Sequence, residues 1–97
     1  MTYQEQIDHI MDEFDFARVR QMMADVGWNW GWDSEAHIPD EVELRRSARG
    51  HLRACAFDGN AVSGSGGFTA MKDDGRLCLF WGIDSYGIMD GVEASDE

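Results

Sequence analysis

The side chains that most often carry chemistry in enzymes are present in this chain, but none stands in a pattern typical of catalysis or metal binding. The three histidines, His9, His37 and His51, are far apart and lack a partner at the spacing of a zinc site. No serine lies in a nucleophile elbow, and no local signature pairs Cys55 or Cys78 with a histidine. The sequence therefore predicts a protein that is not an enzyme and that holds no metal or cofactor.

Two short segments resemble parts of ligand-binding loops, but both are better explained as connections. The Gly- and Ser-rich run over residues 63–67 lacks the Lys-Ser/Thr ending of a phosphate-binding loop, and it leads into a strand instead of a helix. Asp73, Asp74 and Gly75 lack the remaining oxygen ligands of a calcium loop. We therefore expect a flexible loop at the first segment and a hairpin turn at the second.

Net charge is the strongest signal in the composition. The 19 acidic residues outnumber the 8 basic ones, which gives a net charge of −11 over 97 residues. This charge repels phosphates and argues against direct binding of nucleic acid, and it favours attraction to basic surfaces of other proteins. Three blocks, residues 1–15, 28–44 and 84–97, each carry a net charge of −5, whereas residues 45–53 carry +4.

Length and composition predict one small soluble domain. Hydrophobic residues make up 43% of the chain, enough for a core, and no apolar run approaches the roughly 20 residues that span a bilayer. The N-terminus does not resemble a signal peptide, so we expect a cytosolic protein whose two cysteines are buried free thiols. We expect residues 1–83 to form a single α+β domain and residues 84–97 to form an acidic, mobile C-terminal tail.

The first 27 residues predict helix on both sides of a bend. Thr2 and Glu5 form a capping-box pattern that starts a helix at Tyr3. Asp15 is a suitable N-cap for a second helical run over residues 16–26, which Gly27 would end. The pattern leaves open whether these runs are one bent helix or two.

An acidic ridge follows from the spacing of carboxylates on the first helix. Four acids step by three, four and three residues along one stripe, with no neighbouring cation: Glu5, Asp8, Asp12 and Asp15. Asp33 and Glu35, in a predicted polar loop, would support the ridge if they lie on the same side of the molecule. These six residues are the candidate partner-binding site.

A third helix is predicted from Pro39 to about Phe57. Gly50 weakens its middle. Arg45, Arg49 and Arg53 follow one another at intervals of four residues, with Arg46 beside them, and form a basic stripe in an acidic protein.

The predicted sheet has three antiparallel strands with two to three helices packed on one face, which is an α+β fold. Trp28, Trp30 and Trp32 alternate along one strand and would form the floor of the core. The other two strands, residues 68–72 and 76–83, would form a hairpin. Cys78 and Phe80 would point to the opposite face of the sheet, which we expect to be partly covered or to bind something.

The order of these features resembles a group of short, mostly uncharacterised phage and prophage proteins. The resemblance covers about residues 12–83 and implies the α+β architecture more than any activity. The Arg-rich third helix and the acidic tail depart from the pattern. The motifs that carry the resemblance are the helix through Leu52 together with Phe14-Asp15-Phe16, Gly27-Trp28-Asn29-Trp30, Ile38-Pro39, Gly66-Gly67-Phe68 and Leu77-Cys78-Leu79.

Small acidic phage proteins without an enzyme motif are similar in kind to anti-CRISPR inhibitors. The resemblance implies a phage-encoded inhibitor of a host nucleic-acid-targeting complex, acting as a DNA mimic in the cytoplasm of an infected or lysogenic bacterium. The acidic ridge would compete with DNA or RNA for a basic groove. The alternative is a non-catalytic phage regulatory or assembly accessory, which binds one protein through the sheet face or the Arg-rich helix.

Overall fold

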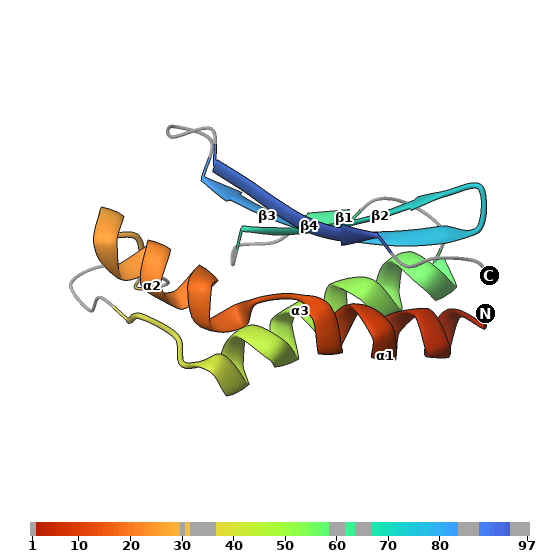
Figure 1. Ribbon diagram of the computed structural model, residues 1–97, viewed down its shortest axis with the longest axis horizontal. Helices are drawn as coiled ribbons and strands as arrows, with labels where there is room; N and C mark the ends of the chain where they lie inside the picture. The colour runs from red at the N-terminus through yellow and green to blue at the C-terminus, as the bar shows by residue number, and fades with distance from the viewer. Residues whose placement is uncertain are drawn as a thin grey trace.

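The computed structural model describes residues 2–29, 31, 37–58, 62–63, 67–83 and 88–93. Helices α1 and α3 cover one face of an antiparallel sheet, and α2 continues the helical layer beyond α1 (Figure 1). This arrangement confirms an α+β fold with helices on one face of an antiparallel sheet, but the predicted sheet of three strands is not confirmed. The elements are α1 (Tyr3–Glu13), α2 (Phe16–Val26), α3 (Glu41–Asp58), β1 (Val62–Ser63), β2 (Phe68–Asp73), β3 (Arg76–Ile83) and β4 (Ile88–Glu93).

The central hairpin forms where the sequence predicts it. The strands lie in the order β1-β2-β3-β4, and each neighbouring pair is antiparallel. In the β2–β3 hairpin, Phe68 pairs with Trp81 and Asp73 pairs with Arg76. The turn residues Asp74 and Gly75 have φ angles of 51° and 79°. Positive φ at both positions is what a two-residue hairpin turn requires, and an Asp-Gly pair adopts it readily.

The predicted tryptophan strand is wrong for the residues that the structure describes. Trp28, Asn29 and Gly31 lie outside any strand, and Trp30 and Trp32 fall outside the described residues. The N–H of Trp28 donates to the carbonyl of Met23 at 2.9 Å, so its backbone closes the end of α2. Its ring packs on Trp81, with 5.2 Å between ring centroids. Helix capping and ring packing therefore take the place of strand pairing.

The strand that pairs with the free edge of β3 comes from the predicted tail. Ile83 of β3 pairs with Ile88, and Cys78 pairs with Glu93. Residues 88–93, which were predicted to belong to a mobile tail beyond residue 83, therefore form the strand at this edge of the sheet. At the start of the predicted Gly- and Ser-rich loop, Ser63 and the preceding Val62 form the short strand β1. The rest of the predicted tail, residues 84–87 and 94–97, lies outside the described residues.

Side-chain caps set the helix boundaries. Thr2 and Glu5 form the predicted capping box of α1, and Asp15 accepts a hydrogen bond from the N–H of Arg18 as the N-cap of α2. The sequence left open whether these two runs are one bent helix or two. The extended backbone of Phe14, with φ −73° and ψ 131°, separates them into two helices. Gly27 ends α2 in the left-handed conformation, as predicted.

Helix α3 begins two residues later than predicted. The N–H of Glu43 donates to the Asp40 carboxylate, and the N–H of Asp40 donates to the Glu43 carboxylate, both at 2.9 Å. This reciprocal pair caps the helix at Glu41. Pro39 therefore precedes the helix and does not form its first turn.

The core lies between the helices and the sheet. Trp81 of β3 is the largest fully buried side chain, and Trp28 packs only partly against the core. Val42 on α3 is 62% exposed. The core residues are Ile7, Ile10, Met11, Phe14, Phe16, Val19, Met23, Leu44, Ala48, Leu52, Cys55, Ala56, Phe68, Ala70, Leu77, Leu79 and Trp81.

One buried polar side chain joins α1 to the hairpin. Gln6 is 1% exposed, and its Nε2 donates to the carbonyl of Gly75 at 3.0 Å. Its Oε1 accepts a hydrogen bond from the N–H of Leu77 at 2.9 Å. Both ends of one amide thus bind backbone groups of the hairpin. Because the bonds fix the side of α1 that faces the sheet, they also fix the side that faces solvent.

The glycines give a matched test of the packing at Trp28. Gly67 and Gly75 both have positive φ, but a Cβ at Gly67 would collide with the Trp28 ring, whereas a Cβ at Gly75 would meet nothing. We expect Gly75→Ala to cost about 1 to 2 kcal/mol from backbone strain alone. Gly67→Ala should cost about 3 kcal/mol or more because it adds the steric conflict. Urea denaturation of both variants measures the difference, and equal losses would contradict this packing.

Replacing Gln6 tests the link between α1 and the hairpin. Gln6→Leu leaves the Leu77 N–H and the Gly75 carbonyl without their partner, so we expect a loss of about 2 to 4 kcal/mol in the free energy of unfolding. Gln4→Leu is the control, because Gln4 is exposed and its side chain bonds, among the described residues, only to Asp8 on the same helix. Its loss should stay within about 0.5 kcal/mol. Similar losses in the two variants would show that the link is unimportant.

Candidate protein-binding surfaces

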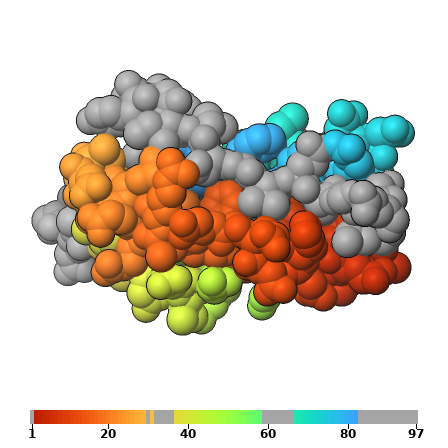
Figure 2. Space-filling view, viewed as in Figure 1, coloured from red at the N-terminus to blue at the C-terminus, as the bar shows by residue number. Residues whose placement is uncertain are grey.

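The predicted acidic ridge exists on the solvent side of α1. Glu5, Asp8 and Asp12 are exposed and lie opposite the buried residues of the helix. Asp15 is also exposed, at the start of α2. Helix α1 contains no lysine or arginine, and no described cation lies within ion-pair distance of these four carboxylates. Figure 2 shows α1 and α2 side by side on one face of the molecule, with α3 emerging below them.

Local hydrogen bonds orient most of the ridge carboxylates. Glu5 accepts from the backbone N–H of Thr2, Asp8 accepts from the side chain of Gln4, and Asp15 accepts from Arg18. Each carboxylate keeps acceptor capacity beyond its one bond, because an ionised carboxylate has about four lone-pair sites. Asp12 makes no such contact among the described residues. The ridge is therefore largely pre-oriented, which lowers the entropic cost of binding a partner.

The capping box also affects the ionisation of the ridge. Hydrogen bonds from the Thr2 backbone and then from the Thr2 hydroxyl lower the pKa of Glu5 below its usual value. This carboxylate consequently stays charged to lower pH than an ordinary glutamate. The other two predicted site residues, Asp33 and Glu35, lie outside the described residues, so the structure does not place them beside the ridge.

All four arginines of the predicted basic stripe are exposed, but one of them also makes contacts with the other helices. Arg45 donates to the carbonyl of Met11 at 3.1 Å and lies 4.7 Å from the centroid of the Phe16 ring. It therefore holds the end of α1 and the start of α2 against α3. This role could not be predicted from the sequence, because the partner carbonyl is on another helix.

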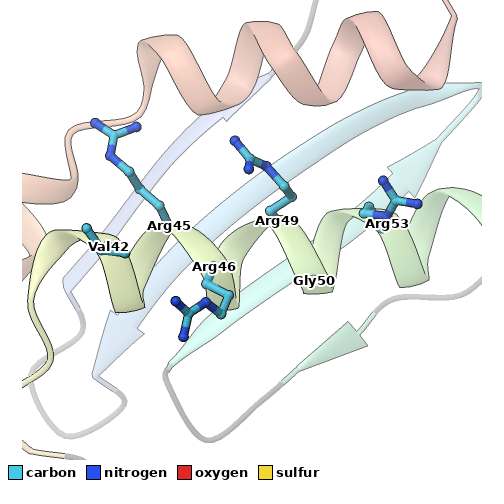
Figure 3. Close-up of a pocket in the computed structure, with 6 residues that line it drawn as sticks. All are labelled: Val42, Arg45, Arg46, Arg49, Gly50 and Arg53. Carbon is cyan, nitrogen blue, oxygen red and sulfur yellow. The ribbon is translucent and has the colours of Figure 1, made fainter.

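The remaining arginines line a hollow on the outer side of α3. Arg46, Arg49 and Arg53 are exposed and have no ion pair or hydrogen bond with the described residues. The hollow has a volume of about 440 Å³, and Val42, Arg45 and Gly50 complete its lining. In Figure 3, Arg45 and Arg49 extend toward α1, whereas Arg46 points to the other side of α3. This surface can bind carboxylates or phosphates.

The outer face of the sheet is a third surface. Met71 on β2 is 45% exposed and pairs with Cys78 on β3, which is half-buried. Phe80 is also half-buried and pairs with Thr69, two residue pairs along the same hairpin. This apolar strip agrees with the prediction that Cys78 and Phe80 point away from the main core.

Groups suited to catalysis do not converge among the described residues. Both thiols are free, and burial raises the pKa of Cys55 and of Cys78, which disfavours the reactive thiolate. Cys55 is buried as predicted, but Cys78 is only half-buried. His37 bonds to Glu43 at 2.9 Å just before α3, and His51 bonds to the carbonyl of Ser47. The described residues contain no cluster of three or more potential metal ligands.

Within the part of the chain that the structure describes, no helix combines the length and apolar character needed to cross a bilayer. Comparison of the chain with protein-family models, curated proteins and solved structures finds no match. The features that bear on function are therefore the acidic ridge, the arginine-lined hollow and the apolar strip on the sheet.

Removing the capping box tests the ionisation of the ridge. In Thr2→Ala, the hydroxyl that bonds to Glu5 N–H is lost and the capping geometry is disturbed, so we expect the Glu5 pKa to rise toward its ordinary value. Because the folded-state pKa is lowered, the contribution of Glu5 to stability is present above its unfolded-state pKa and is lost as pH falls through the folded-state pKa. NMR titration of the carboxyl carbon measures the shift. Thr2→Ser keeps the hydroxyl and should leave the pKa unchanged.

Proposed function

We propose that the protein is a non-catalytic inhibitor that docks its acidic ridge into the basic groove of a nucleic-acid-binding protein complex. The ridge then occupies the place of DNA or RNA. The observation that carries the proposal is the row of exposed carboxylates on α1, which no described cation neutralises. A host defence complex of the CRISPR type, in the cytoplasm of an infected or lysogenic bacterium, is the target that the resemblance to phage proteins suggests.

The geometry of the ridge supports competition for a groove built to bind phosphates. Seven helical steps separate Glu5 from Asp12, so the three carboxylates extend over about 10 Å along the axis. Carboxylates on neighbouring turns of a helix stand about 5 to 6 Å apart at their Cβ atoms, so several of them can face one cluster of lysines and arginines. The negative charge of the whole protein adds long-range attraction to such a cluster.

A second candidate function is that of an accessory protein that binds one partner through the outer face of the sheet. The observation that favours it is the apolar strip of Met71, Cys78 and Phe80 on that face. Binding through this strip would be insensitive to charge reversal on α1, and it would be weakened by Met71→Asp.

The first experiment identifies the partner. The tagged protein is incubated with nuclease-treated lysates that contain CRISPR effector complexes, and bound proteins are eluted with rising salt. We expect a nucleic-acid-binding complex to elute at moderate salt, because carboxylate–lysine and carboxylate–arginine contacts are screened. Added target DNA or RNA should displace the protein. A partner without a nucleic-acid groove that stays bound at high salt would instead support the sheet-face function.

Charge reversal on the ridge tests the mechanism. In Asp8→Lys with Asp12→Lys, we expect affinity for the captured complex to fall about 100-fold or more while the fold is retained, because attraction becomes repulsion. Glu13→Lys with Asp58→Lys is the matched control. It changes the net charge equally at exposed acids outside the ridge and should weaken binding far less. Circular dichroism checks the fold, and unchanged inhibition by the folded ridge variant would overturn the proposal.

A further inference from the structure

Two exposed charged rows of opposite sign lie on neighbouring helices. The acidic row is Glu5, Asp8 and Asp12 on α1, and the basic row is Arg46, Arg49 and Arg53 on α3. All six side chains lie on the solvent side of their helix. None forms an ion pair among the described residues, although their two helices pack against each other.

The two rows have the same spacing. Each steps by three and then by four residues, so each extends over about 10 Å of helix. When two such helices run in opposite directions, the end residues of the rows still align, and the middle residues are offset by only about 1.5 Å. A long arginine side chain easily spans this offset.

The packing of α1 on α3 places the rows at the same level within one molecule. The helices run antiparallel (Figure 1), with Tyr3 beside Phe57 at one end and Met11 beside Arg45 at the other. Averaged over these two contacts, Glu5 is about level with Arg53, and Asp12 is about level with Arg46. All six side chains are exposed, and among the described residues no ion pair joins the acids of one molecule to its own arginines.

We infer that the α1–α3 surface is a self-association site, on which a second copy of the chain docks about a two-fold axis parallel to the helices. Such an axis keeps every residue at its level and exchanges the acidic and basic rows. Asp8 then faces Arg49 of the second copy, and Glu5 and Asp12 face Arg53 and Arg46 of the second copy. Symmetry forms each contact twice, so one surface satisfies both rows.

The hollow on α3 fits this occupant. Gly50 lies among the arginines, and a Cβ added there would meet nothing within 4 Å. Packing within the chain therefore does not require glycine, although glycine in a helix is unfavourable. Its missing side chain lets another helix approach α3 closely. Val42, 62% exposed at the end of the hollow, offers apolar contact to the same helix.

This inference is independent of the proposed inhibitory function. Self-association covers the ridge, so a copy engaged in this way would not bind a basic groove at the same time. The net charge of −11 on each copy opposes association, which makes the contact reversible and dependent on concentration. Salt screens both the repulsion and the attraction, so charge exchange, not salt, provides the decisive test.

The test uses purified full-length protein alone, in sedimentation velocity over a concentration series. We expect Asp8→Arg and Arg49→Asp, each by itself, to weaken self-association about tenfold or more, because each places like charges opposite one another. A mixture of the two variants in equal amounts should associate like the wild type. In the mixed dimer, both contacts again join an acid to an arginine, and simple misfolding of either variant could not produce this rescue.

Two controls separate the effect of position from the effect of net charge. Glu13→Arg and Arg20→Asp change the net charge as Asp8→Arg and Arg49→Asp do, but their exposed side chains lie outside the two rows. Their self-association should remain within about threefold of the wild type. A wild-type chain that stays monomeric throughout the series would overturn the inference. So would single variants that associate normally, or a mixture that fails to recover association.

Discussion

The buried amide of Gln6 is the interaction on which the arrangement of the charged surfaces depends. It binds a carbonyl and an N–H of the β2–β3 hairpin, so it fixes the rotation of α1 about its own axis. Successive residues of an α-helix are about 100° apart around its axis, so a rotation of α1 would expose a different stripe of side chains. With Gln6 inward, Asp8 and Asp12 must face solvent. Gln6 is buried and would not touch a binding protein, yet it determines which charged side chains of α1 are exposed to that protein.

Arg45 completes this arrangement from the other helix. Its guanidinium joins the last turn of α1 to α3 and covers the Phe16 ring at the start of α2. A cation near the C-terminus of a helix is favourable because the carbonyl ends there carry partial negative charge. One arginine of the basic stripe therefore neutralises a helix end, whereas Arg46, Arg49 and Arg53 make no hydrogen bond or ion pair with the described residues.

Local signals in the sequence predicted local structure well, and pairing over long distances was missed. Thr2, Asp15 and Gly27 set helix ends through bonds to residues a few positions away, and the Asp74-Gly75 turn determines the hairpin register. The partner of the free edge of β3 could not be found this way, because Ile88–Glu93 is short, contains two acids and resembles a solvated tail. The tryptophan strand was wrongly predicted for a related reason. Alternating apolar residues indicate a strand, but they do not reveal that the backbone of Trp28 closes the end of α2.

The candidate surfaces show the same division between local and distant information. The exposure of Glu5, Asp8 and Asp12 follows from helical spacing, so the sequence was sufficient to predict it. The sequence could not show that Arg45 is bound internally while Arg46, Arg49 and Arg53 are not, since that depends on which helix lies alongside. Nor could the sequence show that the acidic row of α1 and the basic row of α3 lie at the same level along the two helices. The packing of α1 on α3 determines how the two rows align. If α1 were shifted along α3 by one helical turn, both rows would keep their spacing, but the acids would no longer lie at the same level as the arginines.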